Sequence, residues 1–277
     1  MKRYSPAKVN LILEVLRKRK DGYHDLATLM QPVSLYDEMD LSLKGSEIVV
    51  KCPGSSLPEN EENIAYRAAE ALLKRAGCRQ GVEIVIRKKI PIAAGLGGGS
   101  SNAAATLIAL NELLRLSFTT EELMKIGTQL GADVPFFIFG KTAWAFGIGD
   151  QLREATGIPK LWFVILNPGI EIATKTVYEA LKLGLTKERI NTSIQKFQTA
   201  ADIAGKLRND LEDPAFLLHP MLVNLKKMHL EHGALGSLMS GSGSTVFGIY
   251  ETEQKAWEAA ESMKRKGALF VFTAHSL

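Results

Sequence analysis

The sequence predicts an α+β fold with two domains. Strand-like and helix-like segments follow one another without a regular β-α-β rhythm, and this mixture argues against a doubly wound parallel sheet. The chain has 277 residues, which is enough for two domains of ordinary size. Glycine and proline residues mark a loop at 147–159, so we expect one domain at 1–155 and another at 156–277.

The composition excludes several classes of protein. Apolar residues make up 46% of the chain, and 34 basic residues against 30 acidic residues leave a net charge of +4. These values exclude a disordered chain, and the near-neutral charge argues against a nucleic-acid-binding protein. Cys52 and Cys78 are too few for a disulfide framework, so we expect two free thiols in a reducing compartment. We therefore expect a cytoplasmic protein that binds neither nucleic acid nor membranes.

A basic cluster near the start of the chain has more than one interpretation. Residues 17–20 (RKRK) could contact nucleic acid, and a basic N-terminal segment can be a transit peptide. The preceding residues 9–16 instead alternate like a strand, and the cluster leads into the turn signal Asp21-Gly22. A solvated hairpin tip is therefore the better interpretation.

Apolar spacing predicts the elements of the first half of the chain. The helix at 63–76 is the clearest, because its apolar residues form one stripe and Gly77 follows as a stop signal. Thr119 and Glu122 have the spacing of a capping box at the start of another helix. The remaining predictions are strands at 8–16, 39–44, 47–52, 82–87 and 136–146, and helices at 101–114 and 120–131.

The second half is predicted to contain helices and short strands in alternation. His229 and His232 lie three residues apart on a predicted helix, but no third metal ligand is evident, so we expect a surface pair. No Gly-x-Ser-x-Gly motif is present, which argues against a common serine hydrolase. The predicted strands are 161–166, 245–250 and 269–273, and the predicted helices are 174–181, 221–231 and 253–266.

The most informative segment is the glycine-rich stretch from Pro91 to Ala103. Glycine lets the backbone approach a ligand closely and turn its N–H groups inward, and the N-terminus of the helix that follows attracts anions. Ser100, Ser101 or Asn102 could cap that helix. A tight turn is the alternative, but four glycines among residues 95–99 exceed what a turn needs. The segment therefore favours a phosphate site.

Two familiar phosphate motifs do not fit this loop. A Walker loop has lysine after its last glycine, where this chain has Ser100. The dinucleotide fingerprint needs a third spaced glycine, which is missing after Gly95 and Gly97. Neither an ordinary P-loop nor a dinucleotide fold is expected.

The stretch from Pro91 to Ala103 resembles the ATP loop of the GHMP small-molecule kinases, which include galactose, homoserine, mevalonate and phosphomevalonate kinases. Residues 5–11 (SPAKVNL) and 239–245 (MSGSGST) match two further motifs of this family. Residues 21–24 (DGYH) and 131–135 (GADVP) narrow the resemblance to the member that phosphorylates the 2-hydroxyl of a cytidine diphosphate derivative of methylerythritol, in non-mevalonate isoprenoid precursor biosynthesis. The five motifs cover nearly the whole chain in order.

The resemblance implies a fold and a reaction. The expected fold has a ribosomal-protein-S5-like N-terminal domain and a ferredoxin-like C-terminal domain, with the active site between them. The expected reactants are ATP with Mg²⁺ and a small-molecule acceptor, and the expected state is a monomer or weak homodimer. The resemblance gives no ligand of Mg²⁺ in this sequence.

The resemblance also implies roles for individual residues. Asp133 is the expected acceptor of the hydroxyl proton, and Lys8 is expected beside it. Tyr23 and His24 are expected to recognise the cytosine, with Tyr178 on the other side of the base, and Asn10 and Thr174 to contact the substrate. The residues expected to bind ATP are Pro91, Ala94, Gly95, Leu96, Gly97, Gly98, Gly99, Ser100, Ser101, Asn102 and Asn63.

Simpler interpretations of these residues remain open. Asn63 could be only a helix cap, Tyr178 could be a core residue, and Lys8 could be a solvated charge at a strand edge. Another acceptor, such as mevalonate, homoserine or a sugar, is the alternative enzyme, although these offer no base for Tyr23 and His24. A nucleotide- or RNA-binding protein without catalysis is the alternative from another class.

Overall fold

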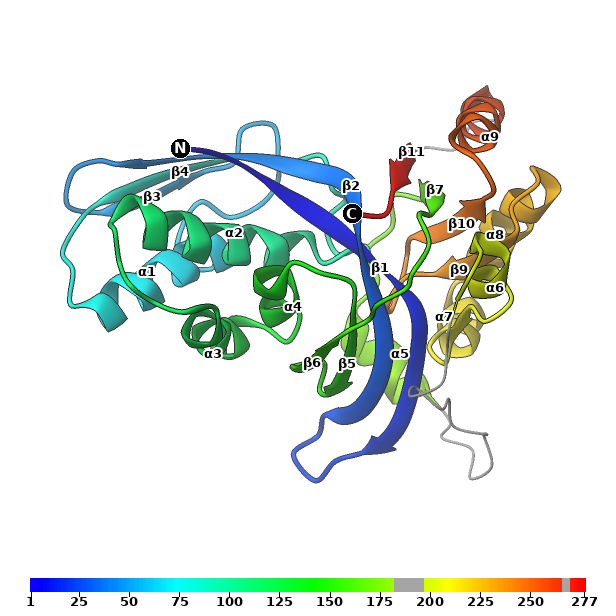
Figure 1. Ribbon diagram of the computed structural model, residues 1–277, viewed down its shortest axis with the longest axis horizontal. Helices are drawn as coiled ribbons and strands as arrows, with labels where there is room; N and C mark the ends of the chain where they lie inside the picture. The colour runs from blue at the N-terminus through cyan, green and yellow to red at the C-terminus, as the bar shows by residue number, and fades with distance from the viewer. Residues whose placement is uncertain (182–196, 266–269) are drawn as a thin grey trace. The chain divides into compact units, whose positions relative to one another are not determined.

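The computed structural model describes residues 1–181, 197–265 and 270–277, which group into two compact units (Figure 1). Two long strands, β1 (Lys2–Lys18) and β2 (His24–Leu43), contribute residues to both units. The boundary expected near residue 155 stays a prediction. The first unit comprises Met1–Ala7, Leu35–Ile90 and Gly97–Gly140, and the second comprises Lys8–Ser34, Pro91–Leu96 and Lys141–Leu277.

The first unit carries four helices on one face of a small sheet (Figure 1). The C-terminal half of β2 pairs with β4 (Val82–Arg87) in antiparallel register, and β4 pairs with β3 (Ile48–Lys51) in parallel register. The alternation predicted for β4 is confirmed, because Val82, Ile84 and Ile86 are fully buried. The helices are α1 (Ile64–Ala76), α2 (Gly98–Leu113), α3 (Thr120–Leu130) and α4 (Val134–Phe139).

Local signals fix the ends of α1 and α3 as predicted. The Asn63 side chain accepts a hydrogen bond from the Ala65 N–H at 2.9 Å, and Gly77 ends α1 with a left-handed φ of 62°. Thr119 and Glu122 form both bonds of a capping box at the start of α3. A side-chain cap of this kind contributes about 1 kcal/mol to helix stability.

The strand predicted at 136–146 is wrong in its first half. Val134–Phe139 forms the short helix α4, and β5 (Ala143–Gly147) begins only after Gly140. A short apolar run does not distinguish a buried strand from a buried helix by its periodicity. Here Pro135 lies in the first turn of α4 and Gly140 adopts a left-handed conformation at its end, so the two breakers bound a helix.

In the second unit, short strands pair with β1 and β2. Residues 26–30 of β2 pair with β5, which pairs in turn with β6 (Gln151–Glu154), inside the segment that the sequence predicts as a loop. Residues 12–13 of β1 pair in parallel with β8 (Arg208–Asn209). The prediction missed β6, β8 and the N-terminal half of β2, because their burial does not alternate cleanly.

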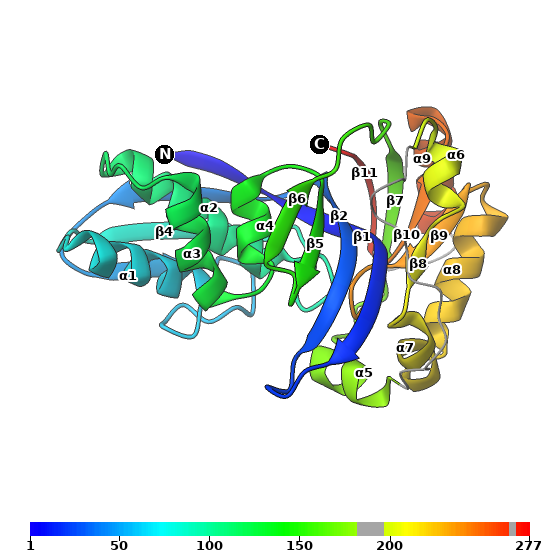
Figure 2. The same cartoon turned by 60° about the horizontal axis from the view of Figure 1, so that its bottom comes forward.

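The second unit also contains a four-stranded antiparallel sheet in the order β11-β7-β10-β9. With helices between β7 and β9 and after β10, this order is that of a ferredoxin-like β-α-β-β-α-β unit, as predicted. Helices α8 (Met221–Glu231) and α9 (Glu253–Arg265) share one apolar cluster with this sheet (Figure 2). The strands are β7 (Trp162–Asn167), β9 (Gly236–Met239), β10 (Val246–Tyr250) and β11 (Phe270–His275).

Three shorter helices complete the described part of the second unit. They are α5 (Thr174–Ala180), α6 (Ala200–Ala204) and α7 (Glu212–Leu218). The sequence predicted α5 but missed α6 and α7, which are too short to display a helical period. None of the helices in the described residues is long and apolar enough to cross a membrane. Both cysteines are free thiols, as predicted.

The prediction of a surface histidine pair is wrong for His229. This side chain is fully buried on α8, with its ring 3.3 Å from the Tyr250 hydroxyl and 3.3 Å from the Val246 carbonyl oxygen. Gly248 makes the room, since a Cβ there would lie 2.6 Å from the His229 ring. Burial lowers the pKa of His229 to about 4. In the described part of the chain, no group of three His, Cys, Asp or Glu residues could hold a metal.

The buried imidazole predicts a loss of stability in mild acid. Because the folded state disfavours the charged ring, the unfolded state binds more protons once the pH falls below 6.5, and stability decreases down to about pH 4. We expect this decrease to be on the order of 3 kcal/mol. Urea unfolding of the native protein and of His229→Gln between pH 7 and 4 measures it. Equal pH dependence in both proteins would contradict the assignment.

Candidate active site

Three consecutive carbonyl groups, all in the second unit, fix the glycine loop, residues 91–97. The Ala94 carbonyl oxygen accepts from the Thr245 N–H at 3.3 Å, and the Leu96 carbonyl oxygen accepts from the Lys8 N–H at 3.0 Å. Between them, the Gly95 carbonyl oxygen accepts from the Ser240 hydroxyl at 2.9 Å. The loop therefore turns its carbonyl groups towards β1 and the 240–245 segment.

The loop also contains three residues in the left-handed backbone conformation. Ala93, Gly95 and Gly97 adopt left-handed φ values of 50°, 76° and 71°. Left-handed residues that alternate with right-handed ones aim successive N–H groups at one point, where an anion can bind. Ala93 has a side chain in this conformation and is one of two such non-glycine residues in the described chain. Phosphate binding at this loop stays a prediction.

The helix after the loop begins without a side-chain cap. The N-cap residue of α2 is Gly97, and the cap expected from Ser100, Ser101 or Asn102 is not formed. The N–H groups in the first turn of a helix have no partner inside the helix and carry a partial positive charge. Ser101 is buried, and its hydroxyl has no hydrogen-bond partner among the described residues. This end of α2 offers donors that suit a phosphate group.

Lys8 is held in position by a chain of hydrogen bonds on β1 and β2. Its ammonium donates to the Asn10 Oδ1 at 2.6 Å, and the Asn10 Nδ2 donates to the Thr28 hydroxyl at 2.9 Å. The Thr28 hydroxyl donates in turn to the Ile12 carbonyl oxygen at 2.7 Å. Lys8 and Asn10 are both buried, so Lys8 is not a solvated edge charge. The sequence predicted Lys8 and Asn10 but missed Thr28.

Asp133 occupies the turn between α3 and α4 in the first unit. It is the N-cap residue of α4, yet its side chain makes no capping hydrogen bond to that helix. The side chain is half-buried, and Pro135 in the first turn of α4 restricts the backbone around it. A catalytic role for Asp133 stays a prediction. The structure brings Lys8 and Asn10 together, whereas Asp133 belongs to the other unit.

An aromatic stack lies near the hairpin of β1 and β2. The rings of His24 and Tyr178 are stacked, with centroids 4.9 Å apart and an interplanar angle of 27°. Burial, and secondarily the charge of Lys18, lowers the pKa of His24. The ring is therefore neutral at pH 7, with one hydrogen-bond donor and one acceptor. Tyr23, the residue before His24 in the chain, is 60% exposed.

The hairpin tip itself is solvated, as predicted from the basic cluster. Residues 17–23 are exposed, and Arg17 and Arg19 form ion pairs with Asp25. Arg19 also pairs with Asp21 at 2.7 Å. These exposed pairs contribute little to stability, but they neutralise part of the basic cluster within the hairpin.

Two other predicted residues have structural partners. The Asn63 side chain caps α1 and donates to the Pro58 carbonyl oxygen at 2.7 Å, which confirms the capping interpretation. The Thr174 hydroxyl lies 2.9 Å from the Ser242 hydroxyl in the 240–245 segment. A contact of either residue with a ligand stays a prediction.

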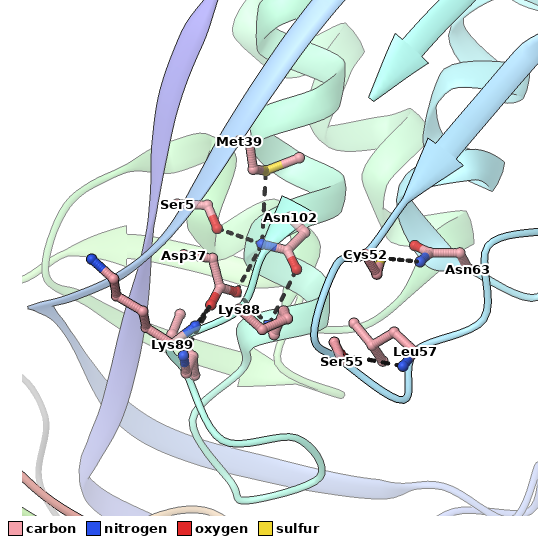
Figure 3. A network of polar contacts seen from close by, with 11 residues as sticks. Ser5, Asp37, Met39, Cys52, Ser55, Leu57, Asn63, Lys88, Lys89 and Asn102 are labelled. Atoms are coloured by element: carbon pink, nitrogen blue, oxygen red, sulfur yellow. Dashed lines mark hydrogen bonds and ion pairs between the residues drawn. The ribbon is translucent and has the colours of Figure 1, made fainter. Parts of the chain in front are cut away.

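Sequence reasoning missed a buried polar network in the first unit (Figure 3). The carboxylate of Asp37 on β2 forms an ion pair with Lys88, and both contact the amide of Asn102 on α2. One signal could have revealed it, because Asp37 stands between Leu35 and Met39 on the buried face of an alternating strand. A charged residue at a position that the period assigns to the core marks a functional or structural network.

Comparisons with known proteins identify relatives of the whole chain. Residues 63–141 match the family described as GHMP kinases N terminal domain, and residues 186–269 match GHMP kinases C terminal. The chain is 57% identical to the 4-diphosphocytidyl-2-C-methyl-D-erythritol kinase of Syntrophus aciditrophicus (strain SB), over 100% of this chain and 99% of that protein. It is 49% identical to the kinase of the same name from Syntrophotalea carbinolica, over 97% of this chain and 96% of the relative.

A solved structure is similar over the same length. The crystal structure of a 4-(cytidine 5'-diphospho)-2C-methyl-D-erythritol kinase has a TM-score of 0.87 and 38% identity, covering 100% of this chain and 99% of that one. A homoserine kinase from Cytophaga hutchinsonii has a TM-score of 0.75 at 22% identity, covering 100% and 94% of the two chains, and shares the fold. The α+β, two-domain fold class predicted from the sequence is thus confirmed.

The tight contact at Gly95 predicts that a single methyl group added at this residue strongly lowers the stability of the protein. A Cβ at Gly95 would lie 2.1 Å from the Ser240 carbonyl oxygen, in a backbone conformation that favours glycine. We expect Gly95→Ala to lower the free energy of unfolding by about 2–4 kcal/mol, measured by urea unfolding. Gly99→Ala is the control, since its Cβ would make an ordinary contact of 3.6 Å with Ile64. Equal stability of the two variants would contradict the close approach.

Proposed function

The chain belongs to the 4-diphosphocytidyl-2-C-methyl-D-erythritol kinases of the GHMP kinase family, and from this we propose that it transfers a phosphoryl group from ATP to the 2-hydroxyl of 4-diphosphocytidyl-2-C-methyl-D-erythritol. The observation that carries the proposal is the 57% identity to a kinase of that name over the full length of the chain. The reaction belongs to non-mevalonate isoprenoid precursor biosynthesis. The protein is an ATP-dependent kinase of small molecules.

We propose that the phosphates of ATP bind at the glycine loop and the first turn of α2. The uncapped helix start and the left-handed loop residues support this assignment, because both present N–H groups to an anion. A phosphate there would satisfy donors that have no partner inside α2. The proposed ATP-binding residues are Pro91, residues 94–102 and Asn63, and Asn63 is proposed to lie near the adenine.

We propose that Mg²⁺ accompanies ATP at this site. Mg²⁺ in kinase sites is bound by substrate phosphates and few protein oxygens, so the site needs no cage of carboxylates. The buried Ser101 hydroxyl, which has no partner among the described residues, has the chemistry to hold it. When bound, the ion would neutralise charge that develops on the transferred phosphoryl group.

We propose that Asp133 accepts the proton of the acceptor hydroxyl. Asp133 is half-buried in the turn before α4, where Pro135 restricts the backbone, and this place suits a carboxylate that must meet a substrate oxygen. Lys8 would stabilise the oxygen as negative charge develops on it. The bonds from Lys8 to Asn10 and from Asn10 to Thr28 support this role, since they fix the direction of the ammonium before substrate binds.

We propose that the cytosine binds beside His24 and Tyr178. A stacked pair of flat rings offers a face for a base, and a neutral imidazole can both donate to and accept from its edge. Tyr23 has an exposed ring that could cover the base, while Asn10 and Thr174 would contact the rest of the acceptor.

The proposed location of the protein is the cytoplasm. The proposed state is a monomer or weak homodimer without a nucleic-acid partner.

The choice of acceptor is tested by the release of ADP. With ATP and Mg²⁺, we expect rapid ADP formation with the cytidine diphosphate acceptor and little with mevalonate, homoserine or galactose, because these lack a base. A coupled assay with each acceptor at equal concentration measures the preference. Activity with mevalonate alone would contradict the proposal, and absence of ADP release with every acceptor would favour a binding protein.

The role of Asp133 is tested by a substitution that keeps its shape. Asn cannot accept the hydroxyl proton, so we expect Asp133→Asn to lower kcat at least ~100-fold while the Kd of ATP changes less than about threefold. Asp213→Asn, an exposed acidic residue in the first turn of α7, is the control and should retain full activity. A near-normal kcat in Asp133→Asn would exclude the proposed base.

A further inference from the structure

The carboxylate of Asp37 is fully buried and receives hydrogen bonds from both sides of the glycine loop (Figure 3). Its Oδ1 accepts from the Lys89 N–H at 2.8 Å and from the Ile90 N–H at 2.9 Å. These two residues immediately precede Pro91, where the loop begins. Its Oδ2 accepts from the Asn102 Nδ2 at 3.0 Å, on the helix that follows the loop. One side chain thus holds the segment before the loop and the helix after it.

The Asn102 amide extends this anchor to β1. Its Nδ2 also donates to the hydroxyl of Ser5 at 2.6 Å, and its Oδ1 accepts from the Lys88 ammonium at 3.3 Å. Asn102 and Ser5 are buried. Both polar atoms of the amide are therefore occupied inside the protein, and Asn102 fixes the position of α2 on the strands of the first unit.

Lys88 places a positive charge beside the start of α2. Its side chain is 8% exposed, it forms the ion pair with Asp37, and its Nζ lies 3.1 Å from where a Cβ on Gly98 would stand. A cation near a helix N-terminus is unfavourable unless an anion is close. Asp37 supplies that anion in the free protein, and a bound phosphate would add a second one.

Stability alone does not account for a buried ion pair at this position. Removing two charges from water costs several kcal/mol per ion, and apolar residues of similar size often give an equally stable core. Asp37 lies between Leu35 and Met39 on a buried strand face, where an apolar side chain would ordinarily pack. What an apolar residue could not do is accept two backbone N–H groups and an amide at once.

We infer that Asp37 is a positioning residue for ATP, which sets the geometry of the glycine loop and the first turn of α2 and thereby the affinity for the ATP phosphates. This inference rests on the proposed function, because it requires that ATP binds at that loop. Asp37 does not itself contact ATP. It acts through Lys89, Ile90 and Asn102, and its loss changes nucleotide binding more than acceptor binding.

Asp37→Asn tests the inference with little change in volume. The remaining oxygen can still accept from Lys89 and Ile90, but the new NH₂ group faces the Lys88 ammonium and the Asn102 amide, both of which are donors. We expect the Kd of a non-hydrolysable ATP analogue and the KM of ATP to rise about tenfold, while the KM of the acceptor changes less than twofold. Calorimetry and steady-state kinetics measure these constants.

Two further variants separate positioning from stability. The double variant Asp37→Asn, Lys88→Met removes both charges and so leaves no unpaired cation inside the protein. It keeps the experiment informative if the single variant unfolds. We expect the Kd of the ATP analogue to rise about tenfold in this variant as well. Asp40→Asn changes an exposed aspartate on the same strand, paired with Arg87, and should alter neither constant.

Two outcomes overturn the inference. One is a folded Asp37→Asn or double variant that binds the ATP analogue within twofold of the native protein, even if its Tm is lower. The other is an equal rise of both KM values, which would indicate a general structural effect. Failure of the proposed function is distinguishable from failure of this inference. In that case the native enzyme would release no ADP with the cytidine acceptor, whatever the variants bind.

Discussion

A loop can present its N–H groups to a phosphate only if its carbonyl groups are satisfied elsewhere, and this constraint organises the site. The carbonyl oxygens of Ala94, Gly95 and Leu96 accept from Thr245, Ser240 and Lys8, so the loop is fixed by residues from distant parts of the chain. Unpaired carbonyl groups would repel the same phosphate that the N–H groups attract. The hydrogen bonds of the loop are therefore as much a part of anion binding as its glycines.

The same requirement explains why polar side chains lie inside the protein next to the proposed site. Asn10 orients Lys8, Thr28 orients Asn10, and Asp37 holds the residues on both sides of the loop. Each buried polar group is costly unless it is hydrogen-bonded. A chain of satisfied groups has one low-energy arrangement, so it keeps a flexible ammonium or a glycine-rich backbone in the geometry that binding needs.

The sequence predicted what local patterns encode and missed what depends on distant partners. The ends of α1 and α3 were predictable because Asn63, Gly77 and Thr119 bond within a few residues of themselves. The contact between Gly95 and Ser240 joins residues 145 positions apart, and no local pattern indicates it. Similarly, His229 on α8 is buried because Gly248 on β10 leaves space for its ring. Only three residues, 140–142, separate α4 from β5, and this junction shows how a short apolar run conceals a change from helix to strand.

The proposed site residues differ in their exposure, and this difference has a functional consequence. Lys8, Asn10 and Ser101 are buried, whereas Tyr23 and Thr174 are exposed near a hairpin tip and a short helix. A substitution at an exposed position disturbs little packing, while one in the buried network disturbs several hydrogen bonds. A homoserine kinase shares this fold at only 22% identity. A fold whose buried network is costly to change and whose exposed contacts are replaceable can therefore serve kinases of different acceptors, and the acceptor must be argued from individual site residues rather than from the fold.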